Sequence, residues 1–375
     1  VLVDSAGVYY LVGRTESDLF VYSLLADGTP NLNFGDSGLT IVRSNAAGGL
    51  PIGLGEPAAA LDAQGRITSA ALRLESFSSL GSSYSVWVTR LDASGDLDTS
   101  FGGTGEFAVD AGSAVSVGSV VIADGDRFFV VGSAAKNGEQ ARPFLLDVGT
   151  GGSKLELLST YGDGPLVGPA FGVMGIQGLV IATGEESAEG VALLVYRPAF
   201  DLSQDPAFEA TRLHLEDGIE PAGIAIGPAG RLHVVGHSVL LDEEAPTQLT
   251  PFVARIRPNG RLDQAFQGKG WVRPGVAAGF ATGVAVDDDR RIILTVGPTT
   301  KPTDPVVVRL RHTGTLDPSF GVGGVVPVSL QSGRIAAIEF GSNGLVIGGA
   351  GVVAGPFSDF FASRLLSTPV ADVEF

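Results

Sequence analysis

The stretch RLDASGDLDTSFGGTGEF, residues 90–107, decides the fold, because it returns as RLRHTGTLDPSFGVGGVV at residues 309–326. Each copy holds Leu-Asp and then Phe, with a glycine six residues before the Phe and another four residues after it. Four phenylalanines stand between two glycines in this way: Phe34, Phe101, Phe266 and Phe320. A motif that returns at intervals belongs to a repeated architecture rather than to a single functional site.

The spacing of these phenylalanines gives the length of the repeat. Phe266 and Phe320 are 54 residues apart, and the 165 residues from Phe101 to Phe266 contain three intervals of 55. Tyr161 and Phe208 stand close to the two positions that this period requires. A unit of about 55 residues has room for four short strands. It therefore favours a β-propeller blade over a solenoid rung, which is usually shorter.

The same repeat explains a protease-like tetrapeptide, Gly-Asp-Ser-Gly, at residues 35–38. In trypsin-like serine proteases this tetrapeptide surrounds the nucleophile. Here Ser37 aligns with Thr104, Lys269 and Gly323, which share no chemistry, whereas the flanking glycines persist. A nucleophilic serine would also need a positioned histidine and a buried acid. The stretch is therefore predicted to be a turn whose backbone angles glycine tolerates.

Each unit also contains an apolar strand, a turn and a second apolar strand, followed by a third strand. The seven turns are centred on Gly7, Gly65, Gly125, Gly178, Gly230, Arg290 and Gly344. We expect an all-β, seven-bladed β-propeller with four antiparallel strands per blade. It would form one domain, 1–375, with approximate units 1–55, 56–112, 113–167, 168–218, 219–277, 278–331 and 332–375.

The unit pattern resembles the delta-60 repeat of bacterial surface and secreted proteins, which is common in myxobacteria. The copies at 90–107 and 309–326 carry the resemblance most clearly, in the order Arg-Leu, Gly-x-Leu-Asp, Phe-Gly and a final glycine. The resemblance implies a propeller and an exported location, in the periplasm, on the cell surface or outside the cell. The family is known by its repeat, so no catalytic residue is carried over from it.

Composition restricts the partners of the chain. Its formal net charge is −17, so it lacks the positive field that attracts proteins to nucleic acid, and we expect no nucleic-acid partner. Mean hydropathy is +0.29, but no apolar run reaches the roughly 18 residues of a membrane helix, so we expect no direct membrane insertion. Cysteine is absent, which excludes disulfides and thiolate metal sites.

An arginine recurs in the third strand of five units. These residues are Arg90, Arg197, Arg255, Arg309 and Arg364. They could form a ring that binds an anionic ligand. Because the arginine returns from blade to blade, we favour a structural role, in which each guanidinium pairs with an aspartate or donates to a neighbouring blade.

Metal sites are weakly indicated. His233 and His237 are four residues apart on a predicted strand, which separates them by about 13 Å and argues against a shared zinc ion. Clustered carboxylates at two turns are weak calcium candidates: Asp124, Asp126, Asp287, Asp288 and Asp289. The alternative is an Asp-rich turn whose side chains bond their own backbone. No other cofactor is expected.

The variable loops direct the functional expectation toward a non-catalytic, exported or cell-surface scaffold that binds a protein partner, within a larger surface assembly. These loops are 44–57, 74–85 (with Phe77 and Tyr84), 133–142, 238–251 and 298–305. A carbohydrate-binding propeller is the first alternative, although Trp87 and Trp271 are not at equivalent positions. A lactonase-like or lyase-like enzyme is the second. No catalytic constellation is visible, because inner-strand segments such as 223–227 are apolar, so the chain is not expected to be an enzyme.

Overall fold

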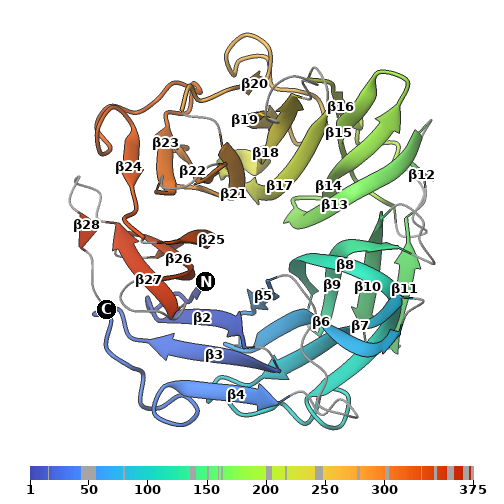
Figure 1. The fold of residues 1–375 in the computed structure, drawn as a ribbon, viewed down its shortest axis with the longest axis vertical. Coiled ribbons are helices and arrows are strands. Elements are labelled where there is room, and N and C mark those ends of the chain that lie inside the picture. The colour runs from blue at the N-terminus through green and yellow to red at the C-terminus, as the bar shows by residue number, and fades with distance from the viewer. Residues whose placement is uncertain are drawn as a thin grey trace. The chain divides into compact units, whose positions relative to one another are not determined.

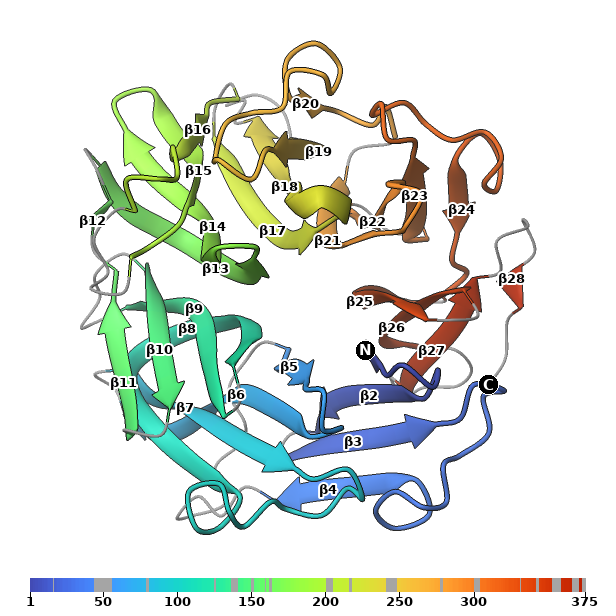
Figure 2. The same cartoon turned by 180° about the vertical axis from the view of Figure 1, so that it is seen from behind.

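The computed structural model describes most of the chain. The described residues are 1–15, 17–43, 56–78, 81–124, 126–135, 141–149, 152–158, 160–161, 164–199, 205–215, 218–240, 248–276, 279–299, 304–330, 332–341, 344–352, 359–365 and 371–372. These residues form strands almost throughout, with one short 3₁₀ helix at Pro228–Gly230, which Figure 2 shows at the turn after β17. Within these ranges no helix could cross a membrane.

The chain consists of two compact units, Val1–Ser159 with Leu166–Gly172, and Thr160–Pro165 with Val173–Phe375. In the first unit, blade 1 is β1 (Leu2–Val3), β2 (Tyr9–Arg14), β3 (Asp18–Leu24) and β4 (Leu39–Arg43). Blade 2 is β5 (Ala58–Leu61), β6 (Ile67–Ser78), β7 (Gly81–Leu91) and the first part of β8 (Glu106–Asp124). Blade 3 is the rest of β8, β9 (Arg127–Ala135), β10 (Arg142–Gly149) and β11 (Gly152–Leu157).

Blade 4 contains β13 (Gly164–Gly175), of which Leu166–Gly172 belong to the first unit. Its other strands belong to the second unit: β14 (Gly178–Ser187), β15 (Gly190–Tyr196) and β16 (Thr211–Leu213), with β12 (Thr160–Tyr161) beside β13. Blade 5 is β17 (Ile219–Ile226), β18 (Leu232–Leu240), β19 (Gln248–Ile256) and β20 (Trp271–Val272). Blade 6 is β21 (Gly279–Val286), β22 (Ile292–Pro298), β23 (Val306–Leu310) and β24 (Val325–Pro327). Blade 7 is β25 (Ser332–Gly341), β26 (Gly344–Val352), β27 (Asp359–Leu365) and β28 (Ala371–Asp372).

The described strands thus form seven antiparallel blades in succession along the chain, which confirms the predicted seven-bladed β-propeller (Figure 1). One strand, β8, serves two blades. Up to Gly112 it pairs with β7, and from Ser113 onward it pairs with β9. Blades 2 and 3 are therefore one continuous seven-stranded sheet.

The hydrophobic core lies between successive blades. Because neighbouring residues of a strand point to opposite faces, Val234 of β18 packs with Phe252 toward blade 4 while Val235 packs with Phe266 toward blade 6. The central strands are consequently buried on both faces, which explains why they read as continuous apolar runs. Similar clusters lie between blades 1 and 2, 2 and 3, and 6 and 7.

A glycine near the end of the second strand has a packing reason. Gly236 of β18 pairs with Phe252 of β19, and a Cβ at Gly236 would lie 2.9 Å from the phenyl ring and closer still to the carbonyl oxygen of Glu220. The same cross-strand pair of glycine and phenylalanine occurs in blades 1, 3 and 7, at Gly13–Phe20, Gly132–Phe144 and Gly349–Phe361. The ring occupies the space that a side chain would need.

The Phe-Gly motif is a turn, as its alignment predicts. Phe101 is buried, its carbonyl accepts the amide of Gly105 at 2.8 Å, and Gly105 adopts a φ of 85° that other residues rarely adopt. Ser37 lies in the equivalent turn of blade 1 with a φ of 57°, and its hydroxyl bonds Asp36 at 3.3 Å.

Candidate functional site

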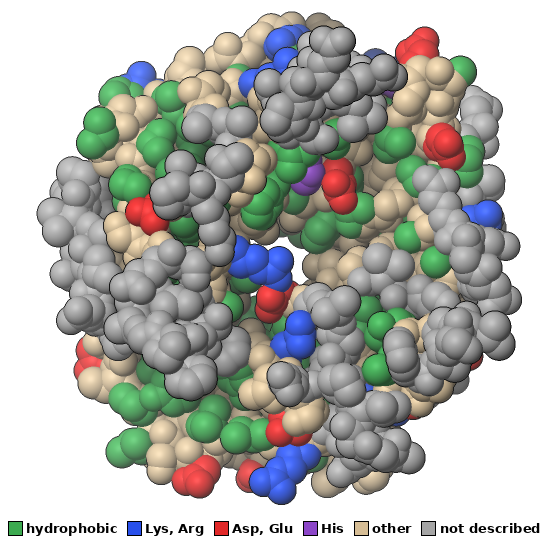
Figure 3. All heavy atoms as spheres, in the orientation of Figure 1, with side chains coloured by type: hydrophobic (Ala, Val, Ile, Leu, Met, Phe, Trp, Pro, Cys, Tyr) green, Lys and Arg blue, Asp and Glu red, His purple; other side chains and the backbone are tan. Residues whose placement is uncertain are grey.

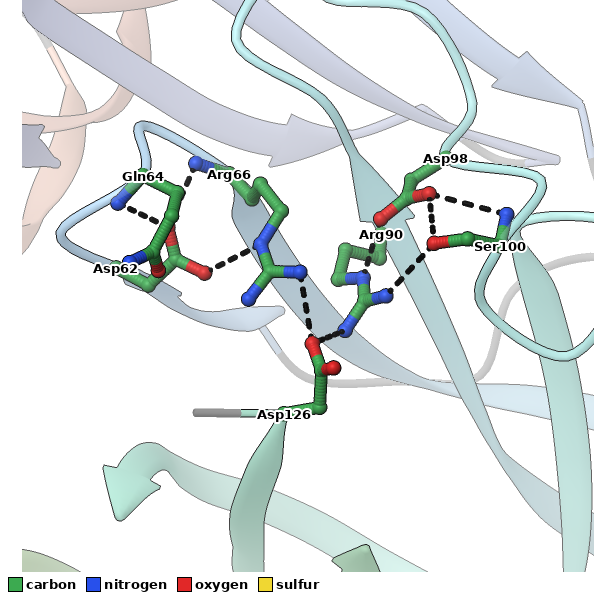
Figure 4. Close-up of polar contacts among 7 residues, drawn as sticks. All are labelled: Asp62, Gln64, Arg66, Arg90, Asp98, Ser100 and Asp126. Carbon is green, nitrogen blue, oxygen red and sulfur yellow. Dashed lines mark hydrogen bonds and ion pairs between the residues drawn. The ribbon is translucent and has the colours of Figure 1, made fainter. Parts of the chain in front are cut away.

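The repeated arginine is bound in a polar network that joins blade 2 to blade 3 (Figure 4). Arg90 of β7 donates from Nε to Asp98 (2.7 Å), from Nη2 to Ser100 (3.3 Å) and from Nη1 to Asp126 (3.0 Å). Arg66 donates from Nη1 to the same oxygen of Asp126 at 2.7 Å. Asp126 belongs to the turn before β9, so its carboxylate connects the two blades.

The charges in this network stabilise one another. The hydrogen bond from Arg66, together with the charges of Arg66 and Arg90, holds the pKa of Asp126 below its ordinary value. Burial alone would raise the pKa of Asp98, but hydrogen bonds from Ser100 and the Arg90 charge outweigh it and the pKa is lowered. Both carboxylates therefore stay ionised at neutral pH.

The same arrangement recurs in blades 4, 5 and 6. Nε of each arginine lies 2.8–2.9 Å from the carboxylate eight residues later, in the pairs Arg197–Asp205, Arg255–Asp263 and Arg309–Asp317. The guanidinium also lies over the ring of the motif phenylalanine, at 4.6 Å for Phe101, 5.1 Å for Phe208, 4.6 Å for Phe266 and 4.5 Å for Phe320. The repeated motif thus places one arginine between a carboxylate and an aromatic ring.

Three blades depart from this pattern. Blade 1 has Ser23 at the arginine position, and blade 3 has Asp147, which Arg127 binds through Nε at 3.0 Å and Nη2 at 2.7 Å. Blade 3 therefore has a carboxylate at the arginine position, and this carboxylate pairs with the arginine that corresponds to Arg66. In blade 7, Arg364 lies on β27, opposite Val346 and Asp372.

The calcium candidates lie against arginines where the structure describes them. Asp126 binds Arg66 and Arg90, and Arg291 lies 2.5 Å from Asp287 and 3.0 Å from Asp289. Asp288 is exposed, and the side chain of Asp124 is outside the described residues. Within the described ranges no group of three or more His, Asp or Glu side chains suits a metal ion. Calcium binding stays an untested prediction.

The two histidines of β18 have separate surroundings. His233 is 2% exposed and pairs across the sheet with Arg255. Burial, together with the charges of Arg255 and Arg231, lowers the pKa of His233 to about 3, so its imidazole is neutral. His237 instead meets an acid, because the β17–β18 register places Glu220 opposite it.

Glu220 and His237 form an acid–imidazole pair in the second compact unit. Nε2 of His237 lies 3.2 Å from Oε2 of Glu220, and the side chains are 11% and 50% exposed, respectively. Nδ1 of His237 is buried without a hydrogen-bond partner in the described part of the chain. The hydrogen bond from His237 outweighs burial and lowers the pKa of Glu220. The pair therefore presents an ionised carboxylate to solvent with an imidazole behind it.

Neither residue of this pair was identified as a site in the sequence. In the sequence His237 stands out only beside His233, in a spacing that argues against a shared zinc ion, and Glu220 is separated from it by 17 positions. The register of the β17–β18 hairpin brings the two residues together, and it includes an irregularity between Pro221 and Gly223.

The predicted loops and aromatic residues lie mostly elsewhere. Residues 44–55, 136–140, 241–247 and 300–303, and the side chain of Phe77, are outside the described residues. Tyr84, in the variable loop 74–85, is half-buried against the cluster between blades 2 and 3 and not exposed for contact with a protein partner. Trp87 is fully buried and donates to Glu106 at 2.8 Å, whereas Trp271 is half-buried under Lys269, whose Nζ is 3.6 Å from the ring centre.

Charge on the face seen in Figure 3 is mixed. Among the coloured side chains, Lys and Arg alternate with Asp and Glu and no extended basic area is visible. The absence of a nucleic-acid partner stays a prediction from the formal charge of −17.

A family model described as a domain of unknown function (DUF5122) β-propeller matches residues 289–320. These residues include Arg309, Asp317 and Phe320, and the match supports a β-propeller repeat family. No curated protein matches the sequence.

Several solved structures are similar to this chain. Polysaccharide lyase Uly1 is 8% identical, with a TM-score of 0.52, over 96% of this chain and 88% of that one. A PL25 ulvan lyase bound to -[GlcA(1-4)Rha3S]- is 11% identical, with a TM-score of 0.51, over 98% and 92%. An α-L-arabinanase from Penicillium chrysogenum is 12% identical, with a TM-score of 0.49, over 96% and 99%. At these identities the likeness shows the fold.

These comparisons correct the expected function. The similar propellers are named as enzymes that act on polysaccharides, which overturns the expectation of a non-catalytic scaffold and of a chain without enzymatic activity. The expectation rested on apolar inner-strand segments. That view missed a pair that cross-strand register alone assembles, at Glu220 and His237.

Proposed function

We propose that this propeller cleaves a polysaccharide, with Glu220 as the base that contacts the substrate and His237 as its positioning residue. The observation that carries the proposal is the exposed Glu220 carboxylate, whose Oε2 lies 3.2 Å from Nε2 of the nearly buried His237. A general base must be ionised at the working pH and must reach the proton that it removes. The lowered pKa of Glu220 meets the first condition and its exposure meets the second.

His237 acts on Glu220 through geometry and charge. A proton on Nε2 is donated to Glu220 and fixes the direction of the carboxylate. When Glu220 receives a proton from the substrate, the imidazole remains beside it as a second group that can hold a proton.

The reaction class that we favour is β-elimination at a uronate residue. Glu220 removes the proton next to the uronate carboxylate, the electrons of that C–H bond form a carbon–carbon double bond, and the glycosidic oxygen leaves with its electron pair and takes a proton from water. The similar lyases support this choice, one of them bound to a polymer that contains glucuronate. Hydrolysis would instead add water and leave no double bond.

The test is cleavage of purified uronate-containing polysaccharides, followed by ultraviolet absorbance of the unsaturated product and by reducing ends. Glu220→Gln keeps the shape of the side chain and should abolish both signals. Glu209→Gln is a matched control, because Glu209 is a 60% exposed acid that pairs with Arg261 away from His237. Reducing ends without ultraviolet absorbance would indicate hydrolysis, and equal activity of E220Q and wild type would refute the assigned base.

Three finer assignments accompany this proposal. We propose that the repeats are of the delta-60 type, supported by the Arg, Leu-Asp and Phe-Gly positions of residues 309–321. We propose an exported protein, because polysaccharides of this kind lie outside cells. A protein partner for the variable loops stays a prediction, to be tested by affinity capture with defined loop replacements.

A further inference from the structure

A cavity of about 270 Å³ lies between blades 6 and 7. It is bordered by the turn between β21 and β22 and by the start of β26, at the strand ends opposite those near Glu220 and His237. Its polar lining includes Asp288, Asp289, Arg291 and Arg309, and its apolar lining includes Ile293, Phe320, Phe340 and Leu345. The cavity is therefore separate from the Glu220–His237 pair, although both lie in the second compact unit.

Arg309, which lines the cavity, differs from the other repeated arginines in the acceptor of its Nη1 group. Nη1 of Arg90 donates to Asp126 at 3.0 Å, Nη1 of Arg197 donates to Gln177 at 2.8 Å, and Nη1 of Arg255 donates to the carbonyl of His312. Arg309 uses Nε for Asp317 and Nη2 for Ser319, both at 2.9 Å. Its Nη1 has no protein acceptor among the described residues, although Arg309 is only 6% exposed.

A second arginine repeats this difference. In the network of blades 2 and 3, Nη1 of Arg66 converges with Arg90 on Asp126. Arg291 occupies the corresponding turn of blade 6, where it binds Asp287 through Nε and Asp289 through Nη2. Its Nη1 also has no acceptor within the described ranges. Arg291 and Arg309, which correspond to Arg66 and Arg90, thus both line the cavity in blades 6 and 7.

We propose that this cavity binds one neutral sugar residue through its hydroxyl groups. A hydroxyl accepts from one group and donates to another, so it can accept from Arg291 and Arg309 and donate to Asp288 or Asp289. An anion would also meet the arginines, but the carboxylates of Asp288 and Asp289 would repel it. The hydroxyl therefore suits the mixed lining better than a carboxylate or a phosphate.

The apolar lining and the volume agree with a sugar ring. Phe340, Leu345 and Ile293 offer apolar surface for the C–H face of the ring. The volume is small for a ligand site, which favours one ring over a longer oligomer. Choosing a sugar over another polyhydroxylic molecule rests on the proposed function. The site itself rests on the cavity and its two arginines.

The test is titration of the full chain with methyl glycosides of neutral hexoses and pentoses, and with glucuronate, by calorimetry or ligand-observed NMR. We expect at least one neutral glycoside to bind, and Arg291→Gln to weaken it by tenfold or more. Arg66→Gln is the matched control, because Arg66 has the same place in a network whose acceptor is Asp126. Leu345→Phe narrows the cavity without touching the charges and should also abolish binding.

Each outcome separates this inference from the proposed function. Binding that persists in Glu220→Gln, survives R66Q and is lost in R291Q and L345F supports the cavity even where no polysaccharide is cleaved. Preference for glucuronate over all neutral glycosides overturns the neutral-sugar assignment. Absence of binding to wild-type protein, or binding unaffected by both cavity variants, overturns the site even where Glu220-dependent cleavage is found.

Discussion

Replacing Asp263 by asparagine should strongly destabilise the second unit, because this carboxylate compensates three arginines. Asp263 is 2% exposed, and Nε of Arg255, Arg231 and Arg257 lies 2.9, 3.1 and 3.2 Å from its oxygens. Burial would raise the pKa of Asp263, but these arginines outweigh it and lower the pKa. An asparagine side chain in its place would keep the volume while removing the charge.

The size of the stability loss depends on which of the three arginines can be hydrated when the carboxylate is removed. The side chains of Arg231 and Arg257 are 38% and 48% exposed and can rehydrate, whereas Arg255 is 9% exposed and cannot. Leaving one buried charge unpaired costs about 3–5 kcal/mol, so we expect a loss of about 3 kcal/mol for Asp263→Asn. Asp289→Asn is the control, because Asp289 is 74% exposed beside Arg291 and should change stability by less than about 0.5 kcal/mol.

Urea unfolding measures this difference through the fluorescence of Trp271, with Trp87 replaced by phenylalanine in every protein so that the second unit alone reports. The stabilisation by Asp263 is present above the unfolded pKa of about 3.9 and is lost as pH falls through the lower folded value. The free energies of unfolding of Asp263→Asn and of the protein that keeps Asp263 should therefore converge at acid pH. Equal destabilisation by D263N and D289N at neutral pH would refute the reasoning.

Three other changes test the remaining interactions. Gly236→Ala should cost about 1–3 kcal/mol in urea unfolding, since its Cβ would lie 2.9 Å from the ring of Phe252, and a neutral result would contradict that contact. Swapping the Arg127–Asp147 ion pair, by Arg127→Asp with Asp147→Arg, should recover part of the roughly 1 kcal/mol or less lost by either single variant, and additivity in a double-mutant cycle would show no coupling. Cleavage activity should persist below about pH 4.3, the ordinary pKa of Glu, because the pKa of Glu220 is lowered in the folded protein. In His237→Gln, the pH at which activity is lost in acid should rise. An unchanged pH profile in this variant would show that His237 does not position Glu220.

The fold could be predicted because its decisive interactions are local in sequence. The turn around Phe101 is closed by Asp98, Gly105 and Arg90, all within 16 residues, so the spacing of the motif contains the geometry. The blade count then follows from repetition alone. The strand register is kept even where the motif departs, since Asp147 takes the place of the arginine in blade 3 and pairs with Arg127.

The candidate site could not be predicted in this way. Residues 223–227 read as an apolar inner strand, whereas β17 begins at Ile219 and includes Glu220 before the irregularity at Pro221 and Gly223. Which residue of β18 faces Glu220 depends on that irregularity, and a shift of one residue would turn His237 to the other side of the sheet. The cavity residues Arg291 and Arg309 could not be predicted from the sequence either. Their Nη1 groups indicate a binding site only when they are compared with Arg66 and Arg90, whose Nη1 groups donate to Asp126.

The continuous strand β8 has a consequence for how the first unit opens. Residues 106–124 leave no turn between blades 2 and 3, so β9 cannot lose its partner without disturbing the backbone that also pairs with β7. Local opening normally follows supersecondary units. The amide hydrogens of these two blades should therefore exchange with deuterium as one cooperative group of seven strands, with the slowest amides of β7 and β9 sharing a common free energy of opening.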